Sequence, residues 1–423
     1  MEWCNMPHVT PETYQTPPDN FVLEYVEVIQ RHHKRTPYSS NIFPKEDIEW
    51  NCDDAGVLSG LHVTDGSRNG VVIQRTSDLY DVNPFKVLHQ QGFVGSNCQF
   101  PQLTKGGFED SITHGQDLRA VYGPLLSLSS SPNTSEAQFR ITNNPITSQV
   151  ASGFFAGFYP AHDFAHQPLP IRIQPSSIDS LEPTYSCPRA GALRESFTTG
   201  ENGSVWQEHL REAGVEGGVW DVLDAVSGIR RDDTGGWHVS FDHYFDNFAG
   251  KQCHDKPLPC NISDPSNCIS QDTAAKVYLT GHWEYEYLYR KAPGAHEYSI
   301  LKFGAWMLEL KARLGDKIRG NTTIKYSHNI AHDGSLSSLL GLLQIEYMFW
   351  PGMGTEVSFE LYRDTSFSSS GTSAWFIRIL YNGQTMQTSS SLGMVDMLPI
   401  QRLFDYIDST VGTGPDLYNR CFS

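Results

Sequence analysis

A short cationic segment near the N-terminus carries side chains that could bind and attack a phosphate group. Residues 31–37 read Arg-His-His-Lys-Arg-Thr-Pro and directly follow an alternating apolar run from Phe21 to Ile29. The β-branched and aromatic residues of that run predict a buried strand, and open α/β sheets bind ligands at strand ends. Arginines can bind an oxyanion there, and a neutral imidazole among cations can act as a nucleophile. A solvated basic loop is the alternative reading of this segment taken alone.

A second segment, late in the chain, combines a histidine with a candidate proton donor. Residues 330–335 read Ile-Ala-His-Asp-Gly-Ser, and the apolar run at 336–343 that follows predicts a helix. His332 and Asp333 would then lie at the N-terminus of this helix, where backbone N–H groups favour anions. An aspartic acid at such a site can deliver a proton to a leaving oxygen. Taken alone, a His-Asp pair before a helix is more often an ordinary cap.

Together, the two segments resemble the motifs of the histidine acid phosphatases, the second branch of the histidine phosphatase superfamily. That family carries Arg-His-Gly-x-Arg-x-Pro near its N-terminus and His-Asp late in the chain. The sequence matches these motifs at Arg31, His32, Arg35, Pro37, His332 and Asp333. Further similar segments, in the family's order, are residues 103–107, 114–122, 253–260, 359–362 and 376–383. The motif also resembles that of a fungal secreted subgroup, in which it reads Arg-His-His-Lys-Arg.

The resemblance implies a phosphomonoester hydrolase, a histidine acid phosphatase that works without a metal or another cofactor. In the family's mechanism, His32 would attack phosphorus and form a phosphohistidine intermediate. The side chains that would bind the phosphate oxygens are Arg31, Arg35 and His332. Asp333 would protonate the leaving alcohol, and because it must be protonated at that moment, an acidic pH optimum is expected. The expected partner is a small phosphorylated or otherwise anionic substrate.

Two positions depart from the family pattern. The family's glycine after the nucleophile is His33 here, and a histidine should narrow or re-line the phosphate pocket. The family's further phosphate-binding arginine falls on Ile146. Losing one arginine–phosphate pair costs about 1.5–3 kcal/mol, so phosphatase activity should weaken unless a neighbour compensates. The candidates for that role are His33, Lys34, Asn143 and Asn144, and the positions that could set substrate choice are His33, Lys34, Ile146 and Asn143. The alternative is a pseudophosphatase or repurposed member that binds an anionic metabolite or catalyses a non-hydrolytic step.

The resemblance also implies the fold. It is an α/β core with a Rossmann-like, mainly parallel sheet flanked by helices, and with an inserted, mostly helical cap domain. The core is expected at residues 18–172 and 276–423, the cap at 173–275 and an N-terminal lead-in at 1–17. The sequence of the predicted cap agrees, because amphipathic stretches such as Val205–Ala213 and Val219–Val226 alternate with glycine-rich turns.

Other stretches predict elements around the candidate site. Helical spacing is found at Leu118–Leu126, Ser148–Phe158 and Ile300–Arg313, and strands are predicted at 168–174, 355–362 and 374–382. The segment 39–100 is rich in Gly, Asn, Asp and Ser, which predicts long loops held by Cys52 and Cys98. His162 and His166 lie one helical turn apart, but the flanking prolines favour a loop over a metal-binding helix.

The composition limits the classes of partner. Among 423 residues, 31 Lys and Arg stand against 48 Asp and Glu, for a formal net charge of −17. A protein this acidic is not expected to bind nucleic acid over a broad face. A local cationic pocket suits the capture of a small phosphorylated substrate instead. No apolar run approaches the length of a membrane span, so no membrane partner is expected.

Cysteines and glycosylation sequons indicate the secretory pathway. The eight cysteines are spaced too widely for a zinc knuckle, so disulfides are expected, with a connectivity that the sequence leaves open. Sequons typical of a secreted glycoprotein occur at Asn133, Asn202, Asn261 and Asn321. Residues 1–7 lack the basic and apolar regions of a signal peptide. We therefore expect a mature or trimmed form, a gene model that has lost its start or, against the other signs, an intracellular protein.

Overall fold

The computed structural model describes residues 2–52, 57–64, 67–74, 82–84, 96–164, 167, 169–200, 203–233, 236–367 and 372–423. They form two compact units. The first, the sheet unit, comprises Glu2–His33, Asp110–Phe197 and Tyr285–Ser423. The second, the helical unit, comprises Lys34–Glu109 and Thr198–Glu284. These limits differ from the predicted cap boundaries at 173 and 275, and the helical unit also takes in the residues that follow His33.

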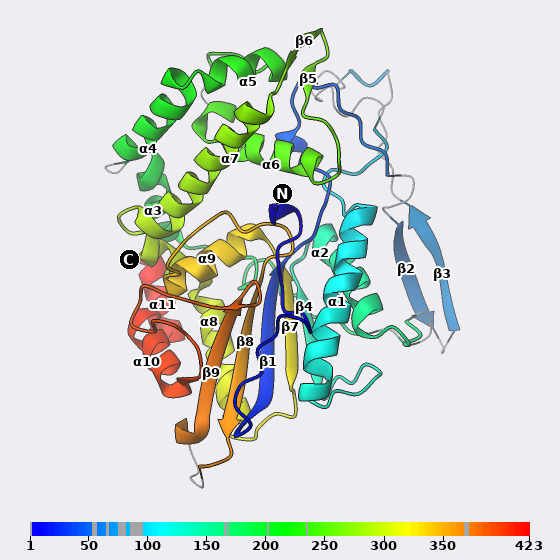
Figure 1. Cartoon of the computed structure of the whole chain (residues 1–423), viewed down its shortest axis with the longest axis vertical. Coiled ribbons are helices and arrows are strands. Elements are labelled where there is room, and N and C mark those ends of the chain that lie inside the picture. The colour runs from blue at the N-terminus through cyan, green and yellow to red at the C-terminus, as the bar shows by residue number, and fades with distance from the viewer. Residues whose placement is uncertain are drawn as a thin grey trace. The chain divides into compact units, whose positions relative to one another are not determined.

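A mixed seven-stranded sheet forms the centre of the sheet unit (Figure 1). Its strands in spatial order are β10 (Gln384–Thr385), β9 (Trp375–Tyr381), β8 (Glu356–Asp364), β1 (Phe21–Arg31), β7 (Tyr326–Ala331) and β4 (Ala137–Ile141), and β11 (Leu398–Pro399) also pairs with β9. β1, β7 and β4 run parallel, whereas β8 is antiparallel to both β1 and β9. Of the five long strands, all but β8 therefore point the same way, which confirms the predicted α/β fold.

Helices cover both faces of this sheet (Figure 1). They are most of α1 (Lys105–Leu125), α2 (Pro145–Phe158), α3 (Pro188–Thr198), α8 (Ala295–Ile318), α9 (Asp333–Leu343), α10 (Ile400–Thr410) and α11 (Gly414–Phe422). On one face, Phe154 of α2 packs on His328 of β7, with ring centres 4.1 Å apart. On the other face, the rings of Trp306 of α8 and Phe359 of β8 lie 5.8 Å apart. The helices predicted within α1, α2 and α8 are confirmed.

The central strand β1 is buried because its sequence is almost continuously apolar. Val26, Val28 and Ile29 are fully buried, as expected of a strand with neighbours on both sides and helices on both faces. Its parallel pairing with β7 continues up to Arg31 opposite Ala331. The carboxyl ends of β1 and β7 thus meet at one edge of the sheet, and both motif segments begin there.

The helical unit packs around an aromatic core. Its helices are α4 (Gly203–Leu210), α5 (Val219–Ser227), α6 (Asp242–Gln252) and most of α7 (Gln271–Glu286), with a π-helical turn at Arg211–Glu216. Two hairpins also belong to it, formed by β2 (Val57–Thr64) with β3 (Ser67–Gln74) and by β5 (Cys260–Asn261) with β6 (Asp264–Cys268). Trp220 stacks on Phe241 with ring centres 4.2 Å apart, and Phe43 packs edge-on against Trp237. The helices predicted from Val205 and from Val219 are confirmed.

The hairpin of β2 and β3 corrects the prediction of loops throughout 39–100. The two strands pair antiparallel over their full lengths. Gly60 and Gly70 interrupt the apolar alternation of the strands, and glycine is a weak strand former. The strand pattern was therefore hidden among residues that are typical of turns.

The prediction of a core strand at 168–174 is wrong. Among its described residues, only Arg172 forms a strand bridge, with Arg140 of β4, and Ile173 is 49% exposed. Pro170 cannot donate a hydrogen bond to a neighbouring strand, so this segment stays at the margin of the sheet.

The predicted disulfides are present. Cys52 pairs with Cys98, Cys187 with Cys421 and Cys260 with Cys268, and no described cysteine is free. One predicted glycan site is corrected. The Nδ2 of Asn261 donates to the carbonyl of Ala225 at 2.7 Å and the residue is 8% exposed, so its amide is not presented for modification. Asn321 is exposed, Asn133 is partly exposed, and Asn202 lies outside the described residues.

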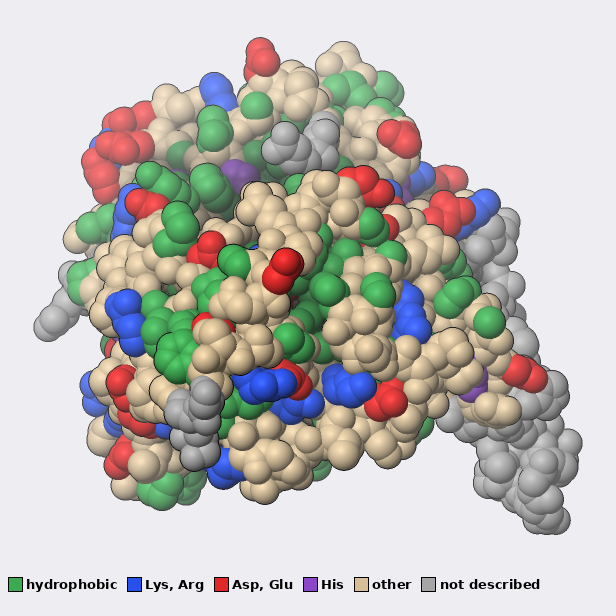
Figure 2. Space-filling view, turned by 60° about the horizontal axis from the view of Figure 1, so that its bottom comes forward, with side chains coloured by type: hydrophobic (Ala, Val, Ile, Leu, Met, Phe, Trp, Pro, Cys, Tyr) green, Lys and Arg blue, Asp and Glu red, His purple; other side chains and the backbone are tan. Residues whose placement is uncertain are grey.

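The surface carries charges of both signs. Figure 2 shows one face, on which Lys and Arg side chains are scattered among Asp and Glu side chains. This face has no broad basic area of the kind that nucleic acid requires. Within the described part of the chain, no helix combines the length and the apolar character of a membrane span.

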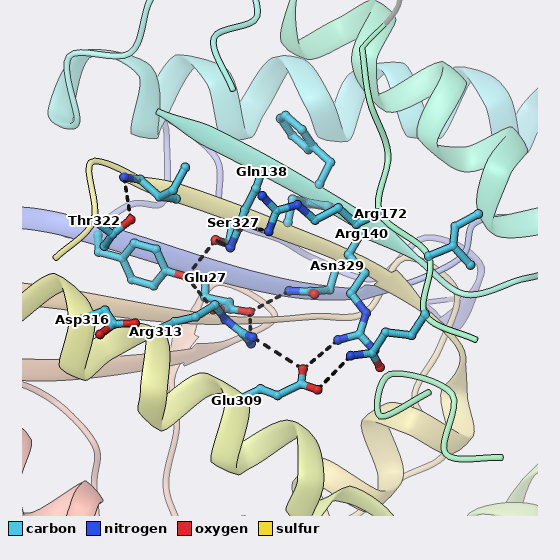
Figure 3. Close-up of a pocket in the computed structure, with 16 residues that line it drawn as sticks. Glu27, Gln138, Arg140, Arg172, Glu309, Arg313, Asp316, Thr322, Ser327 and Asn329 are labelled. Carbon is cyan, nitrogen blue, oxygen red and sulfur yellow. Dashed lines mark hydrogen bonds and ion pairs between the residues drawn. The ribbon is translucent and has the colours of Figure 1, made fainter. Parts of the chain in front are cut away.

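A polar cavity of about 370 Å³ lies between the sheet and α8 (Figure 3). Glu27 of β1 lines it, although this residue is 1% exposed and sits in the central strand. Its two carboxylate oxygens accept from Arg313 of α8 at 2.6 and 2.8 Å, and Asn329 of β7 donates to it at 3.0 Å. Beside them, Arg140 pairs with Glu309 at 2.8 Å. Since these charges neutralise each other, the cavity is not a candidate phosphate site.

Replacing Arg313 by alanine is expected to destabilise the protein by about 3–5 kcal/mol, because the Glu27 carboxylate would stay buried without its charge partner. The matched control is Arg363→Ala. Arg363 pairs at 2.9 Å with Glu24, which lies in β1 like Glu27, but the Arg363 side chain is 44% exposed. An exposed pair contributes about 0.2–1 kcal/mol. Urea unfolding measures both losses, and equal losses would contradict the structural role of the Arg313–Glu27 pair.

Candidate active site

The two motif segments meet at the carboxyl edge of the sheet. Arg31 ends β1 opposite Ala331, which ends β7. The backbone N–H of His32 donates to the carbonyl of Ala331 at 3.0 Å, so the chain stays tied to β7 just beyond the strand. The rings of His32 and His332 lie 5.5 Å apart, edge to face. Parallel pairing of two distant strands therefore brings both histidines into one site.

The imidazole of His32 has a defined tautomer. Its Nδ1 lies 2.9 Å from the carbonyl oxygen of His33. Because a carbonyl only accepts, Nδ1 carries the hydrogen, and Nε2 of the neutral ring carries the lone pair. The residue is buried. A lone pair held in a fixed direction is what nucleophilic attack on phosphorus requires.

Asp333, the first residue of α9, is held by three donors. Its Oδ2 accepts from Arg31 Nη2 at 2.9 Å and from Trp350 Nε1 at 2.8 Å, and its Oδ1 accepts from the backbone of Gly334 at 2.9 Å. These donors and the positive end of the helix dipole stabilise the carboxylate. The side chain keeps 23% of its surface exposed, so a leaving group can reach it.

Arg31 is buried, and protein groups accept hydrogen bonds from only some of its N–H donors. Its Nη1 donates to the carbonyl of Pro351 at 2.6 Å, and its Nη2 pairs with Asp333. Its Nε is buried without a hydrogen-bond partner among the described residues. A guanidinium has five N–H donors, so Arg31 retains donors for a bound oxyanion.

His332 lies between a hydroxyl and a carboxyl group. Its Nε2 is 2.9 Å from Thr142 Oγ1 and 3.7 Å from Glu182 Oε1. Burial, and secondly the nearby charge of Asp179, raise the pKa of Glu182. Protonation of Glu182 would remove a negative charge from the surroundings of His332.

The next two residues of the cationic motif, Lys34 and Arg35, belong to the helical unit. The Arg35 guanidinium is buried and forms a two-point bond to Asp246, at 3.0 and 3.3 Å. It also lies over the ring of Tyr38, 4.4 Å from the ring centre. The carbonyl of Lys34 accepts from the backbone of Thr104 at 3.2 Å. Arg35 is thus committed to a carboxylate that the sequence did not reveal.

The segment that lacks the family's arginine begins α2. Ile146 is fully buried, and its backbone N–H donates to the side chain of Asn144, the N-cap, at 3.0 Å. Asn144 is therefore occupied by capping, whereas Asn143 is exposed. The side chain at position 146 is apolar, so this position itself provides no charge for a phosphate group.

His33 lies in a buried polar cluster on the α1 and α2 face of the sheet. Its Nε2 is 3.3 Å from His114 Nδ1 and 3.4 Å from Gln30 Nε2. His114 in turn contacts Glu356 at 2.9 Å. The imidazole that replaces the family's glycine is therefore packed among the side chains of β1, α1 and β8.

Sequence reasoning missed several of these neighbours. Thr142 follows β4, the third parallel strand, and the carboxyl end of that strand was an available signal. Glu182 and Trp350 lie in loops, and no local pattern marks them. Their contacts depend on tertiary structure that a single sequence does not display.

Among the described residues, no group of three or more His, Cys, Asp and Glu side chains is arranged to hold a metal ion. The predicted pair at 162 and 166 is untested, because His166 lies outside the described residues. The Nε2 of His162 lies 2.8 Å from the carbonyl of Gln167.

No family model matches the chain. It is 26% identical over 417 residues to counting factor 60 of Dictyostelium discoideum, which covers 95% of this chain and 89% of that protein. It is also 23% identical over 446 residues to 2-phosphoxylose phosphatase 1 of Homo sapiens, covering 99% of this chain and 85% of the relative.

Solved structures share the fold at low identity. A multiple inositol polyphosphate phosphatase of Bifidobacterium longum, in complex with inositol hexasulfate, aligns with a TM-score of 0.57 at 9% identity and covers 98% of this chain and 99% of that one. The apo phytase of Hafnia alvei aligns with a TM-score of 0.56 at 14% identity, covering 95% and 99%. The 2-phosphoxylose phosphatase and these structures are histidine acid phosphatases, and this chain has their fold.

Proposed function

We propose that this chain is a phosphomonoester hydrolase that acts through a phosphohistidine at His32, without a metal and at acidic pH. One arrangement carries the proposal. His32, with its Nδ1–H bound to a carbonyl, lies beside His332, while Asp333 bonds Arg31 at 2.9 Å. A nucleophile, a proton donor and a cation are the parts that such a reaction needs. The phosphatase names of the relatives support the same reaction class.

In the proposed first step, His32 Nε2 attacks phosphorus and the bond from phosphorus to the leaving oxygen breaks. Arg31 and His332 bind the equatorial oxygens and stabilise the transition-state charge. The family resemblance assigns Arg35 to the same oxygens.

Asp333 delivers its proton to the departing alcohol oxygen in this scheme. Water then attacks phosphorus of the phosphohistidine, and phosphate leaves with His32 regenerated. The acidic pH optimum implied by the family resemblance corresponds to this protonated form of Asp333. A hydrolysis rate that still rises towards pH 9 would contradict this role.

The proposed substrate is a small phosphorylated molecule. The names of the relatives point to phosphorylated sugars and inositols as the first panel to test. We further propose that the helical unit corresponds to the family's cap domain and that the protein is a secreted glycoprotein of the fungal subgroup. The disulfides and the exposed sequon at Asn321 support that setting.

A second candidate function follows from the charge pattern. Position 146 is a buried isoleucine, and Arg31 and Arg35 are each paired with a carboxylate. A site with fewer available cations suits a repurposed protein that binds an anionic metabolite or catalyses a non-hydrolytic step.

Replacing Ile146 by arginine tests whether the missing arginine limits phosphatase activity. We expect kcat/KM for p-nitrophenyl phosphate to rise about 10- to 100-fold, since an arginine–phosphate bond contributes about 1.5–3 kcal/mol. Ile146→Met is the control for disturbed packing, and circular dichroism confirms folding of both variants. A folded arginine variant without gain would show that position 146 does not limit the reaction.

A further inference from the structure

A buried polar cluster lies directly behind the nucleophile. Its members are Gln30, His33, His114, His328 and Glu356, none of which is more than 1% exposed. Burying polar and titratable groups costs free energy unless they are hydrogen-bonded. Because His33 is bonded in sequence to His32, the arrangement of this cluster bears on the nucleophile.

The orientation of Gln30 is fixed from one side of the cluster. Its Oε1 lies 2.8 Å from His328 Nε2, and His328 Nδ1 lies 2.9 Å from the Tyr326 hydroxyl. An amide oxygen only accepts, so His328 Nε2 carries the hydrogen and Nδ1 accepts from Tyr326. Burial lowers the pKa of His328 and raises that of Tyr326, which agrees with both being neutral. Gln30 therefore turns its amide nitrogen towards His33.

The same reasoning assigns the hydrogens of the other members. His33 Nε2 lies 3.4 Å from the donor Gln30 Nε2 and 3.3 Å from His114 Nδ1, so its single lone pair is shared by two long bonds and His114 Nδ1 carries a hydrogen. The other nitrogen of a neutral His114 accepts, and it lies 2.9 Å from Glu356 Oε2. If Glu356 is protonated, its carboxyl group donates to His114 Nε2, so this last bond also has a donor and an acceptor. Burial raises the pKa of Glu356 and lowers that of His114, as this assignment requires.

The backbone around His32 is held on both sides. The carbonyl of His33 accepts from His32 Nδ1 at 2.9 Å, and the N–H of Gly354 donates to the carbonyl of His32 at 3.1 Å. Gly354 has a φ of +75°, and a Cβ there would come within 2.9 Å of His33 Cε1. A glycine at 354 thus leaves the space that the His33 ring fills.

We propose that His33 is a positioning residue, whose anchored ring holds its own carbonyl in place to bind His32 Nδ1–H and so to direct His32 Nε2 at the substrate. This inference rests on the proposed phosphohistidine chemistry. A glycine at this position would leave the backbone freer, whereas the ring ties it to β1, α1 and β8. Misplacing a reacting group by about 1 Å can cost roughly 10²-fold in rate.

The test compares His33→Ala with Glu356→Gln. In His33→Ala the anchor is lost, so kcat is expected to fall about 10- to 100-fold while KM changes little. Nitrogen NMR of labelled His32 should show one Nδ1–H tautomer in the wild type and a mixture in the variant. In Glu356→Gln the amide oxygen can replace Oε1, which accepts from Val9 N at 2.8 Å. Its amide nitrogen then donates to His114, so activity and tautomer should stay close to wild type.

Two results would overturn the proposal. One is a folded His33→Ala variant with an unchanged kcat and an unchanged His32 tautomer. The other is a Glu356→Gln variant as impaired as His33→Ala, because a carboxylate at 356 would then be required. The NMR measurement needs no activity, so a wild type that hydrolyses nothing refutes the proposed function while the tautomer test of His33 still stands.

Discussion

Replacing His32 by alanine is expected to lower kcat for p-nitrophenyl phosphate by about 10³-fold or more, because the covalent route disappears with the nucleophile. The lone pair on His32 Nε2 follows from the bond between Nδ1 and the carbonyl of His33. The measurement is steady-state hydrolysis between pH 3 and 8 with disulfide-intact protein.

A second histidine provides the control for this loss. His162 lies in a loop, and its Nε2 is 2.8 Å from the carbonyl oxygen of Gln167. His162→Ala should therefore keep its activity within about threefold, since surface substitutions away from a site change stability by only about 0.5 kcal/mol. A His32→Ala variant that is folded and as active as His162→Ala would exclude His32 as the nucleophile.

Replacing Asp333 by asparagine is expected to slow alkyl phosphates far more than aryl phosphates. General acid catalysis contributes about 10²–10⁴-fold, and an alkoxide needs the proton much more than a p-nitrophenolate does. The loss of kcat for glycerol phosphate should therefore approach that range, while p-nitrophenyl phosphate should lose much less. Parallel assays of the two substrates measure the difference.

The comparison of leaving groups also controls for the second role of Asp333. Asparagine would disturb Arg31, which bonds Asp333 Oδ2 at 2.9 Å. A displaced Arg31 weakens phosphate binding for every substrate alike, so it lowers both rates by the same factor. Equal losses for the alkyl and aryl substrates would thus contradict a proton transfer from Asp333.

The sequence was sufficient for the parts of the site that follow from local pattern. The apolar run that becomes β1 and the leucine-rich run that becomes α9 are both continuous along the chain. His32 directly follows β1, and Asp333 is the first residue of α9. The parallel pairing of β1 with β7 then brings the two segments together, as expected for the carboxyl edge of an α/β sheet.

The sequence did not reveal which side chains far along the chain would bond to the motif residues. The bond of Arg35 to Asp246 spans 211 positions, and that of His332 to Thr142 spans 190. Neither partner carries a local signal. His33 was expected to re-line the pocket, yet its ring lies in the buried cluster around His114. Side-chain direction after a strand depends on packing that one sequence does not reveal.

The charges at the candidate site are consistent with the proposed hydrolysis in acidic solution. Arg31 shares its charge with Asp333, and Glu182 places a second carboxyl group 3.7 Å from His332. Burial raises the pKa of Glu182, so this carboxyl group is protonated more readily than a free glutamate.

The most direct test of the account is to look for the covalent intermediate. Wild-type protein is mixed with p-nitrophenyl phosphate, quenched in alkaline detergent, in which phosphohistidine survives, and digested for mass spectrometry, with His32→Ala treated in parallel. The account predicts one phosphoryl group on the peptide that contains His32, and none in the variant. Turnover of the substrate with no phosphorylated histidine, or with the phosphoryl group on another residue, would contradict it.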